Sequence, residues 1–170
     1  MRSPRHLENP MNFRSAAKIS IFSLLYIAVT FAIGLPARAV AAPTVIELTQ
    51  VPCQFLESEN GLDHAYKSSN ISDCEAINTK TGQKRLAASK TIMLKPGPYV
   101  FRVTNKNVPY ELGFWLRGEG VLSRATLPSV SGGGLIQGKT QDYSIDLKPG
   151  EYVYSCPLNP TPNYKLVVKE

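Results

Sequence analysis

Beyond its first 41 residues the chain consists of short apolar segments separated by Pro and Gly, which leaves little room for long helices. Residues 141–147 show the pattern best, because Tyr143, Ile145 and Leu147 fall on one face of an extended chain. Many short strands separated by turn residues are typical of two packed β-sheets. The predicted strands cover residues 45–48, 91–94, 99–103, 110–116, 141–147, 152–154 and 164–168.

One phrase occurs twice in the chain. Leu-Lys-Pro-Gly-Pro-Tyr-Val fills residues 94–100, and Leu-Lys-Pro-Gly-Glu-Tyr-Val fills residues 147–153. Pro fixes φ and Gly accepts positive φ, so each copy signals a turn between two strands. We therefore predict an all-β fold, an antiparallel β-sandwich with two equivalent hairpin turns at one end.

Residues 57–89 are polar and lack strand alternation. Ser72 followed by Glu75 has the spacing of a capping box and predicts a short helix, and residues 83–89 predict another helical turn or two. We expect residues 53–89 to be an insertion that covers one end or edge of the sheets. The glycine-rich residues 129–134 lack the ending of a phosphate-binding loop and are predicted to be a flexible connection.

Most of the positive charge lies in the first 39 residues. The formal net charge of the chain is +6, but from Val40 onward 14 Lys and Arg oppose 12 Asp and Glu, which leaves +2. A body this close to neutral, without a basic run, gives no electrostatic footprint for nucleic acid.

The leader has the layout of an export signal. Arg14 and Lys18 precede an apolar stretch at residues 19–35, and small residues follow it. We interpret residues 1–41 as a signal peptide, cleaved after Ala39 or Ala41. The alternative is a retained anchor helix, for which the apolar stretch is close to the lower length limit.

Export would carry Cys53, Cys74 and Cys156 into an oxidising compartment. Cys53 and Cys74 bracket a polar segment, so we predict a disulfide between them, which would stabilise the fold by roughly 3 kcal/mol through loop closure. The alternative is a metal site made by Cys53, His64 and Cys74, whose spacing matches no common zinc pattern.

A predicted strand, the phrase Leu-Lys-Pro-Gly-Glu-Tyr-Val-Tyr-Ser-Cys at residues 147–156, a loop and a final strand together resemble the C-terminal half of a cupredoxin. Residues 99–111 are similar to the cupredoxin segment that carries the first histidine ligand. The resemblance covers roughly residues 90–170 and the first strand, and it leaves the insertion outside. It implies a plastocyanin-like, Greek-key β-sandwich for residues 42–170.

The resemblance also identifies four ligand positions. Type 1 copper is held by two His, a Cys thiolate and a weak axial Met. The positions that match the two His and the Met are Tyr110, Asn159 and Tyr164, so only Cys156 remains of the set. An Asn amide and a neutral Tyr are poor replacements for imidazole, so the resemblance implies a degenerate copper site, and we expect no cofactor.

Two interpretations of Cys156 stay open. A free Cys packs as a small hydrophobe, and this sequence neighbourhood has no cation to activate the thiol. The alternative is a redox-sensitive or metal-binding thiol. The Pro-rich loop after Cys156 also offers an apolar contact patch, with Leu158, Pro160 and Phe114 or Trp115. Strand alternation requires that one of these two aromatic residues points into the core.

We therefore expect an exported, copper-free, monomeric binding module and not an enzyme. Its partner would be another exported protein, with no nucleic acid and no membrane contact after signal removal. The periplasm, the extracellular space or a thylakoid lumen would suit it. One alternative is a copper-binding electron carrier that uses Cys156 with His64 or Met93. Another is a thiol redox sensor that uses all three cysteines.

Overall fold

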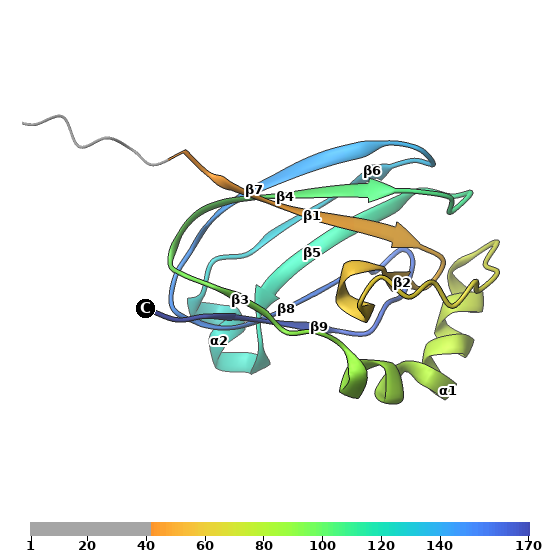
Figure 1. The fold of residues 1–170 in the computed structure, drawn as a ribbon, viewed down its shortest axis with the longest axis horizontal. Coiled ribbons are helices and arrows are strands. Elements are labelled where there is room, and N and C mark those ends of the chain that lie inside the picture. Colours follow the sequence, from red (N-terminus) through yellow and green to blue (C-terminus); the bar gives the residue numbers. More distant parts are fainter. Residues whose placement is uncertain (1–41) are drawn as a thin grey trace, which may run out of the picture. The chain divides into compact units, whose positions relative to one another are not determined.

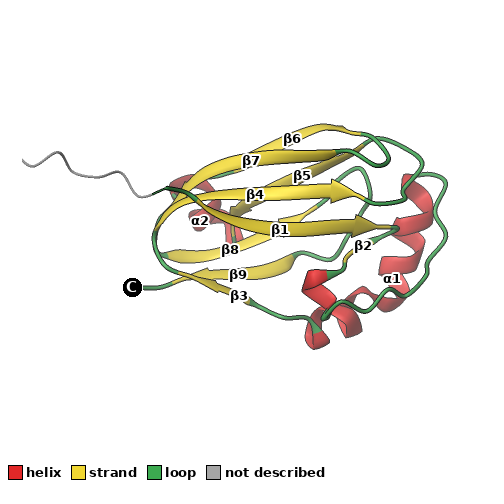
Figure 2. Cartoon of the chain, turned by 45° about the horizontal axis from the view of Figure 1, so that its top comes forward, coloured by secondary structure: helices red, strands yellow, loops and turns green. Residues whose placement is uncertain are grey.

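The computed structural model describes residues 42–170, so the signal peptide predicted at residues 1–41 lies outside the described residues. Two sheets pack face to face (Figure 2). The strands are β1 (Thr44–Val51), β2 (Gln54–Phe55), β3 (Ile92–Leu94), β4 (Gly97–Asn105), β5 (Leu112–Gly118), β6 (Val130–Leu135), β7 (Thr140–Leu147), β8 (Gly150–Ser155) and β9 (Tyr164–Val168). The helices are η1, a single 3-10 turn (Glu57–Glu59), α1 (Ile71–Ala88) and α2 (Gly120–Thr126). Within residues 42–170, no helix has the length and apolar character that crossing a membrane requires.

The predicted β-sandwich is confirmed, but its sheets are mixed. The four-stranded sheet has the order β2-β1-β4-β7, and the five-stranded sheet has the order β3-β9-β8-β5-β6. The pairs β1–β4 and β3–β9 are parallel, so the prediction of antiparallel pairing throughout needs correction. A parallel pair requires a long crossover connection, and the insertion with β3 supplies it between β1 and β4 (Figure 1).

Aromatic rings fill the space between the sheets. Phe114 is 1% exposed and lies within 5.1–6.2 Å, centroid to centroid, of four other rings: Phe55, Phe101, Tyr143 and Tyr154. Its neighbour Trp115 points the other way, where the Arg117 guanidinium lies 3.9 Å from the ring centroid. The alternation expected at this pair is confirmed, with Phe114 in the core.

The two Lys-Pro-Gly phrases are equivalent, as predicted, but they are not hairpins. Each carries the chain from one sheet to the other, β3 to β4 and β7 to β8. In both copies the glycine, Gly97 or Gly150, has positive φ. In both copies the tyrosine hydroxyl, of Tyr99 or Tyr152, donates to the carbonyl of the lysine four residues earlier, at 2.9 Å. The repeat therefore marks a crossing from one sheet to the other. In the sequence, such a crossing carries the same Pro-Gly signal as a hairpin turn within one sheet.

The insertion contains one continuous helix instead of two short ones. The helix α1 begins after Asn70, whose side chain accepts from the Ser72 backbone N–H, and Asp73 completes the capping box. The predicted box at Ser72 and Glu75 is therefore two residues late. The helix lies at the end of the sandwich opposite the C-terminus, which agrees with the predicted role of covering one end (Figure 1).

The glycine-rich segment 129–134, predicted as a flexible connection, lies largely in strand β6. The glycines allow two close approaches. A Cβ at Gly113 on the neighbouring β5 would lie 2.7 Å from the Gly132 carbonyl oxygen, and a Cβ at Gly132 would lie 3.0 Å from the Tyr143 ring. Glycine in a strand commonly marks such contacts. The short helix α2, which precedes β6, was not predicted.

Candidate functional site

Three of the four ligand positions meet at the α1 end of the sandwich, which we call the ligand end. Cys156 directly follows β8, Asn159 lies in the next loop, and Tyr110 precedes β5. The Asn159 backbone N–H donates to Cys156 Sγ at 3.2 Å, and Tyr110 Oη donates to Asn159 Oδ1 at 3.3 Å. The spacing that the resemblance supplied therefore brings these three residues together in space.

The Asn159 amide is buried and is held by the first strand and its turn. Its Oδ1 accepts the Cys53 backbone N–H at 2.8 Å, and its Nδ2 donates to the Val51 carbonyl at 3.1 Å. Cys74 Sγ lies 3.1 Å from the same Oδ1. This is a sulfur–oxygen contact and not a hydrogen bond, because the Cys74 sulfur belongs to a disulfide. The amide thus joins the loop after β8 to the start of the insertion.

The predicted disulfide between Cys53 and Cys74 is confirmed, with Cα atoms 5.0 Å apart. Both sulfurs are used in the bond, so the alternative metal site with Cys53, His64 and Cys74 is wrong. Cys53 follows Pro52 in the turn between β1 and β2 and has φ of 67°. Pro followed by a residue of positive φ is the pattern of a type II turn, in which the second position normally favours Gly. The disulfide therefore uses a turn position whose positive φ would otherwise favour glycine.

Cys156 is the one free cysteine among the described residues, and it is 1% exposed. Its sulfur accepts backbone N–H groups from Gly113 at 3.3 Å and from Asn159. Burial raises the pKa of the Cys156 thiol, and these donors offset only part of that shift. A buried thiol of raised pKa is unreactive, which favours the interpretation of Cys156 as a packed core residue.

Tyr110 closes the ligand end on the solvent side. Its hydroxyl lies 2.6 Å from Ser68 Oγ, in the loop before α1. Burial raises the pKa of Tyr110, and the Ser68 contact reduces that shift without reversing it. The phenol therefore stays protonated at neutral pH and acts as a hydrogen-bond donor.

These donors do not fit type 1 copper. The amide oxygen at the second His position accepts a backbone N–H, and a disulfide sulfur lies against it. Within residues 42–170, no cluster of three or more His, Cys, Asp or Glu side chains is placed to hold a metal ion.

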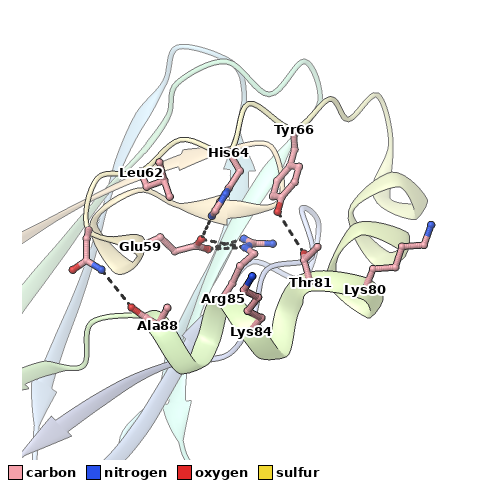
Figure 3. Close-up of a pocket in the computed structure, with 10 residues that line it drawn as sticks. Glu59, Leu62, His64, Tyr66, Lys80, Thr81, Lys84, Arg85 and Ala88 are labelled. Carbon is pink, nitrogen blue, oxygen red and sulfur yellow. Dashed lines mark hydrogen bonds and ion pairs between the residues drawn. The ribbon is translucent and has the colours of Figure 1, made fainter.

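The fourth position, Tyr164, belongs to a different cluster. Its hydroxyl is buried and donates to Glu59, from the 3-10 turn of the insertion. Arg85, from α1, binds the same carboxylate through Nε and Nη2, at 2.6–3.1 Å. His64 Nε2 lies 2.7 Å from Glu59 Oε2 (Figure 3). Met93, the other rival ligand, is 56% exposed on β3.

The Glu59–Arg85 pair was not predicted from the sequence. Both residues are about 6% exposed, although charged residues are rarely buried. One signal was available for Arg85. It lies eleven residues, or about three helical turns, after Cys74, so a helix containing both places Arg85 on the face that the disulfide buries. Glu59 had no comparable signal.

Acid should destabilise the protein through Glu59. Burial raises the pKa of Glu59, but the hydrogen bonds from Arg85, Tyr164 and His64 outweigh burial and hold it below its ordinary value. A lowered folded-state pKa gives stability that is present above the unfolded value, about 4.3, and is lost as pH falls through the folded value. Urea unfolding from pH 7 to pH 3 should show this loss. The variant Glu59→Gln should be less stable at pH 7 and should show a flatter profile, and an equally steep profile would contradict the assignment.

Comparisons with known proteins give structural likeness only. No family model matches the chain, and no curated protein matches it. Auracyanin B is similar over 76% of this chain and 92% of its own, with 12% identity and a TM-score of 0.48. Lac15 from a marine microbial metagenome (14% identity, TM-score 0.35) and a multi-copper oxidase from Pediococcus acidilactici (10%, 0.37) are similar over 79% and 80% of this chain. The chain spans less than a third of the length of these last two proteins.

Proposed function

We propose that this protein is a copper-free binding module on a cupredoxin-like β-sandwich, and that it is not an enzyme. The observation that supports this most is the state of Asn159. Its amide oxygen accepts the Cys53 N–H and lies 3.1 Å from the sulfur of Cys74. The side chain at the position of the second imidazole is therefore already engaged by other groups of the protein.

Copper at the ligand end would carry a cost. Asn159 Oδ1 would have to release the Cys53 N–H, which would be left buried and unpaired. An unpaired buried polar group costs about 1–3 kcal/mol, and an amide oxygen offers little affinity for copper in return.

The same packing supports a non-catalytic role. Cys156 is enclosed and held by backbone donors, and His64 is engaged by Glu59. A nucleophile needs a base within hydrogen-bond reach and access for substrate. The Cys53–Cys74 cross-link is of a kind that persists in oxidising compartments, which supports export by the predicted leader.

Copper titration tests the proposal. We expect no intense thiolate-to-copper absorption band when Cu(II) is added to the oxidised protein, and a spectrum indistinguishable from that of Cys156→Ser. A band in the unmodified protein that Cys156→Ser abolishes would overturn the proposal. Loss of that band in His64→Ala would assign the metal to the electron-carrier alternative, with Tyr110→Phe as the control that removes no imidazole.

A further inference from the structure

The outer face of the five-stranded sheet holds a buried cation that has no carboxylate partner. Arg117 on β5 is 6% exposed, which is as buried as Arg85. Arg85 binds the Glu59 carboxylate through its Nε and Nη2. Arg117, in contrast, forms no ion pair with any carboxylate of residues 42–170. Burial of a guanidinium carries a desolvation cost, which an opposite charge normally offsets.

Neutral groups fill only part of the hydrogen-bonding capacity of Arg117. A guanidinium has five N–H groups. Nη1 donates to the Trp115 carbonyl at 3.3 Å and to the Ser155 hydroxyl at 3.0 Å, and Nη2 donates to Asn163 Oδ1 at 2.8 Å. Nε is buried and has no acceptor among the described residues. The edge formed by Nε and Nη2, which binds a carboxylate in Arg85, therefore meets a single neutral oxygen in Arg117.

A second unpaired guanidinium lies near the first. The guanidinium carbon of Arg124, on α2, lies 5.8 Å from the centroid of the Trp115 ring, which Arg117 contacts at 3.9 Å. Arg124 also has no ion pair with a carboxylate of the described part of the chain. The helix can lie this close to β5 because Gly118 has no side chain, where a Cβ would meet the Ser123 carbonyl. Burial lowers the pKa of Arg117, and the charge of Arg124 lowers it further.

The surface around the two arginines has the composition of a protein-binding surface. Trp115 is partly exposed, and Trp and Arg are the residues most enriched where interfaces contribute most binding energy. A groove of about 370 Å³ adjoins the ring, lined also by Leu158 and Gly113. Glu119, the acid that precedes α2, pairs with Lys165 at 3.5 Å. The carboxylate that Arg117 lacks is therefore not supplied by residues 42–170.

We propose that this surface, which we call the β5 face and which consists of Trp115, Arg117 and Arg124, binds an acidic segment of a partner protein. A carboxylate of the segment takes the Nε–Nη2 edge of Arg117 in place of the exposed Asn163 amide. An apolar side chain beside it lies in the groove next to Trp115. Charge complementarity selects this partner, because both guanidinium groups lack an anion. The inference rests on the binding-module function proposed above and names the partner class.

Titration with an acidic peptide tests the proposal. Trp115 is the only tryptophan of the chain, so its fluorescence reports on the β5 face. The capped peptide acetyl-Ser-Leu-Glu-Asp-Leu-Ser-amide should change this emission and shift the NMR signal of the Arg117 Nε–H. The neutral control, with Gln and Asn in place of Glu and Asp, should bind about tenfold more weakly, since bidentate carboxylate–guanidinium pairs are among the strong hydrogen bonds.

Three outcomes of this titration would overturn the proposal. They are equal affinity for the two peptides, a response confined to residues outside the β5 face, and self-association of the chain through this face without peptide. The readout is separate from copper absorption at Cys156, so the proposed function and this inference can fail independently.

The variant Asn163→Asp supplies a carboxylate from within the chain. It should raise the urea midpoint of unfolding and weaken binding of the acidic peptide about tenfold, because the Nε–Nη2 edge of Arg117 is then filled. Lys106→Gln lowers the net charge by the same amount in the loop after β4, on the other sheet, and should change neither quantity. A lowered midpoint or an unchanged affinity in Asn163→Asp would contradict the assignment.

The variant Arg117→Met tests the same site from the other side. It removes a buried charge without leaving a carboxylate unpaired, so the protein should fold with close to its normal urea midpoint. The variant should bind the acidic and the neutral peptide equally. A retained tenfold preference for the acidic peptide would overturn the proposal.

Discussion

Arg85→Met is expected to lower the free energy of unfolding by about 3–5 kcal/mol. The side chains of Arg85 and Glu59 are each 5% exposed, and the guanidinium donates to both oxygens of the carboxylate. Arg85 also donates to the Cys53 carbonyl at 2.9 Å and to Asn78 Oδ1 at 2.6 Å. Removing it leaves a buried carboxylate without its cation and a backbone carbonyl without its donor. Urea unfolding at pH 7 measures the loss.

The matched control is the double variant with Glu59→Gln and Arg85→Met. It carries no buried charge, so it should recover part of the stability that the single Arg85 variant loses. The single variant should also lose its penalty as pH falls. Its Glu59 would have a raised folded-state pKa, so the penalty decreases as pH falls through that raised value and is gone below the unfolded value of about 4.3. A loss below about 1 kcal/mol at pH 7 would contradict a structural role for this pair, because exposed ion pairs contribute that little.

The strands that could be predicted from the sequence are those with a local signal. The predicted limits of β9 are the observed ones, because its apolar residues alternate with others along the strand. The predicted limits of β7 are within one residue of the observed ones, because its apolar residues alternate and a Pro-Gly turn marks its end. The strand β6 has no such signal. Its glycines are needed for contact with Gly113 and the Tyr143 ring, and these contacts exist only after the sheets have packed.

The candidate site could likewise be predicted only where a local sequence pattern exists. The spacing from Cys156 to Asn159 keeps both residues in one short loop, so their contact follows from the resemblance. Tyr164 is the exception, since its hydroxyl turns toward Glu59 instead of Cys156. The direction of the Tyr164 hydroxyl depends on the insertion. The sequence of the insertion has no strand or helix periodicity that would predict a carboxylate next to β9. A buried ion pair between residues 59 and 85 depends on tertiary packing and has no local pattern.

Removal of the disulfide, as Cys53→Ala with Cys74→Ala, is expected to cost about 3 kcal/mol. Loop closure over a sequence separation of 21 residues contributes roughly 3 kcal/mol, and Ala keeps the backbone strain that Cys53 already carries at a φ of 67°. The loss should be accompanied by greater mobility of α1, because Cys74 ties that helix to the β1–β2 turn. Urea unfolding and amide hydrogen exchange measure the two effects.

A second double variant separates the cross-link from the backbone. Cys53→Gly with Cys74→Ala removes the same disulfide but puts the residue that positive φ favours into the turn, so it should be about 1 kcal/mol more stable than the Ala pair. The backbone N–H at position 53 would still reach Asn159 Oδ1, which keeps the ligand end assembled. Both variants should present one free thiol on unfolding, that of Cys156. Equal stability of the two pairs would show that the turn relaxes out of positive φ once Cys74 is released, and Asn159 would then lose the donor on which the closure of the ligand end depends.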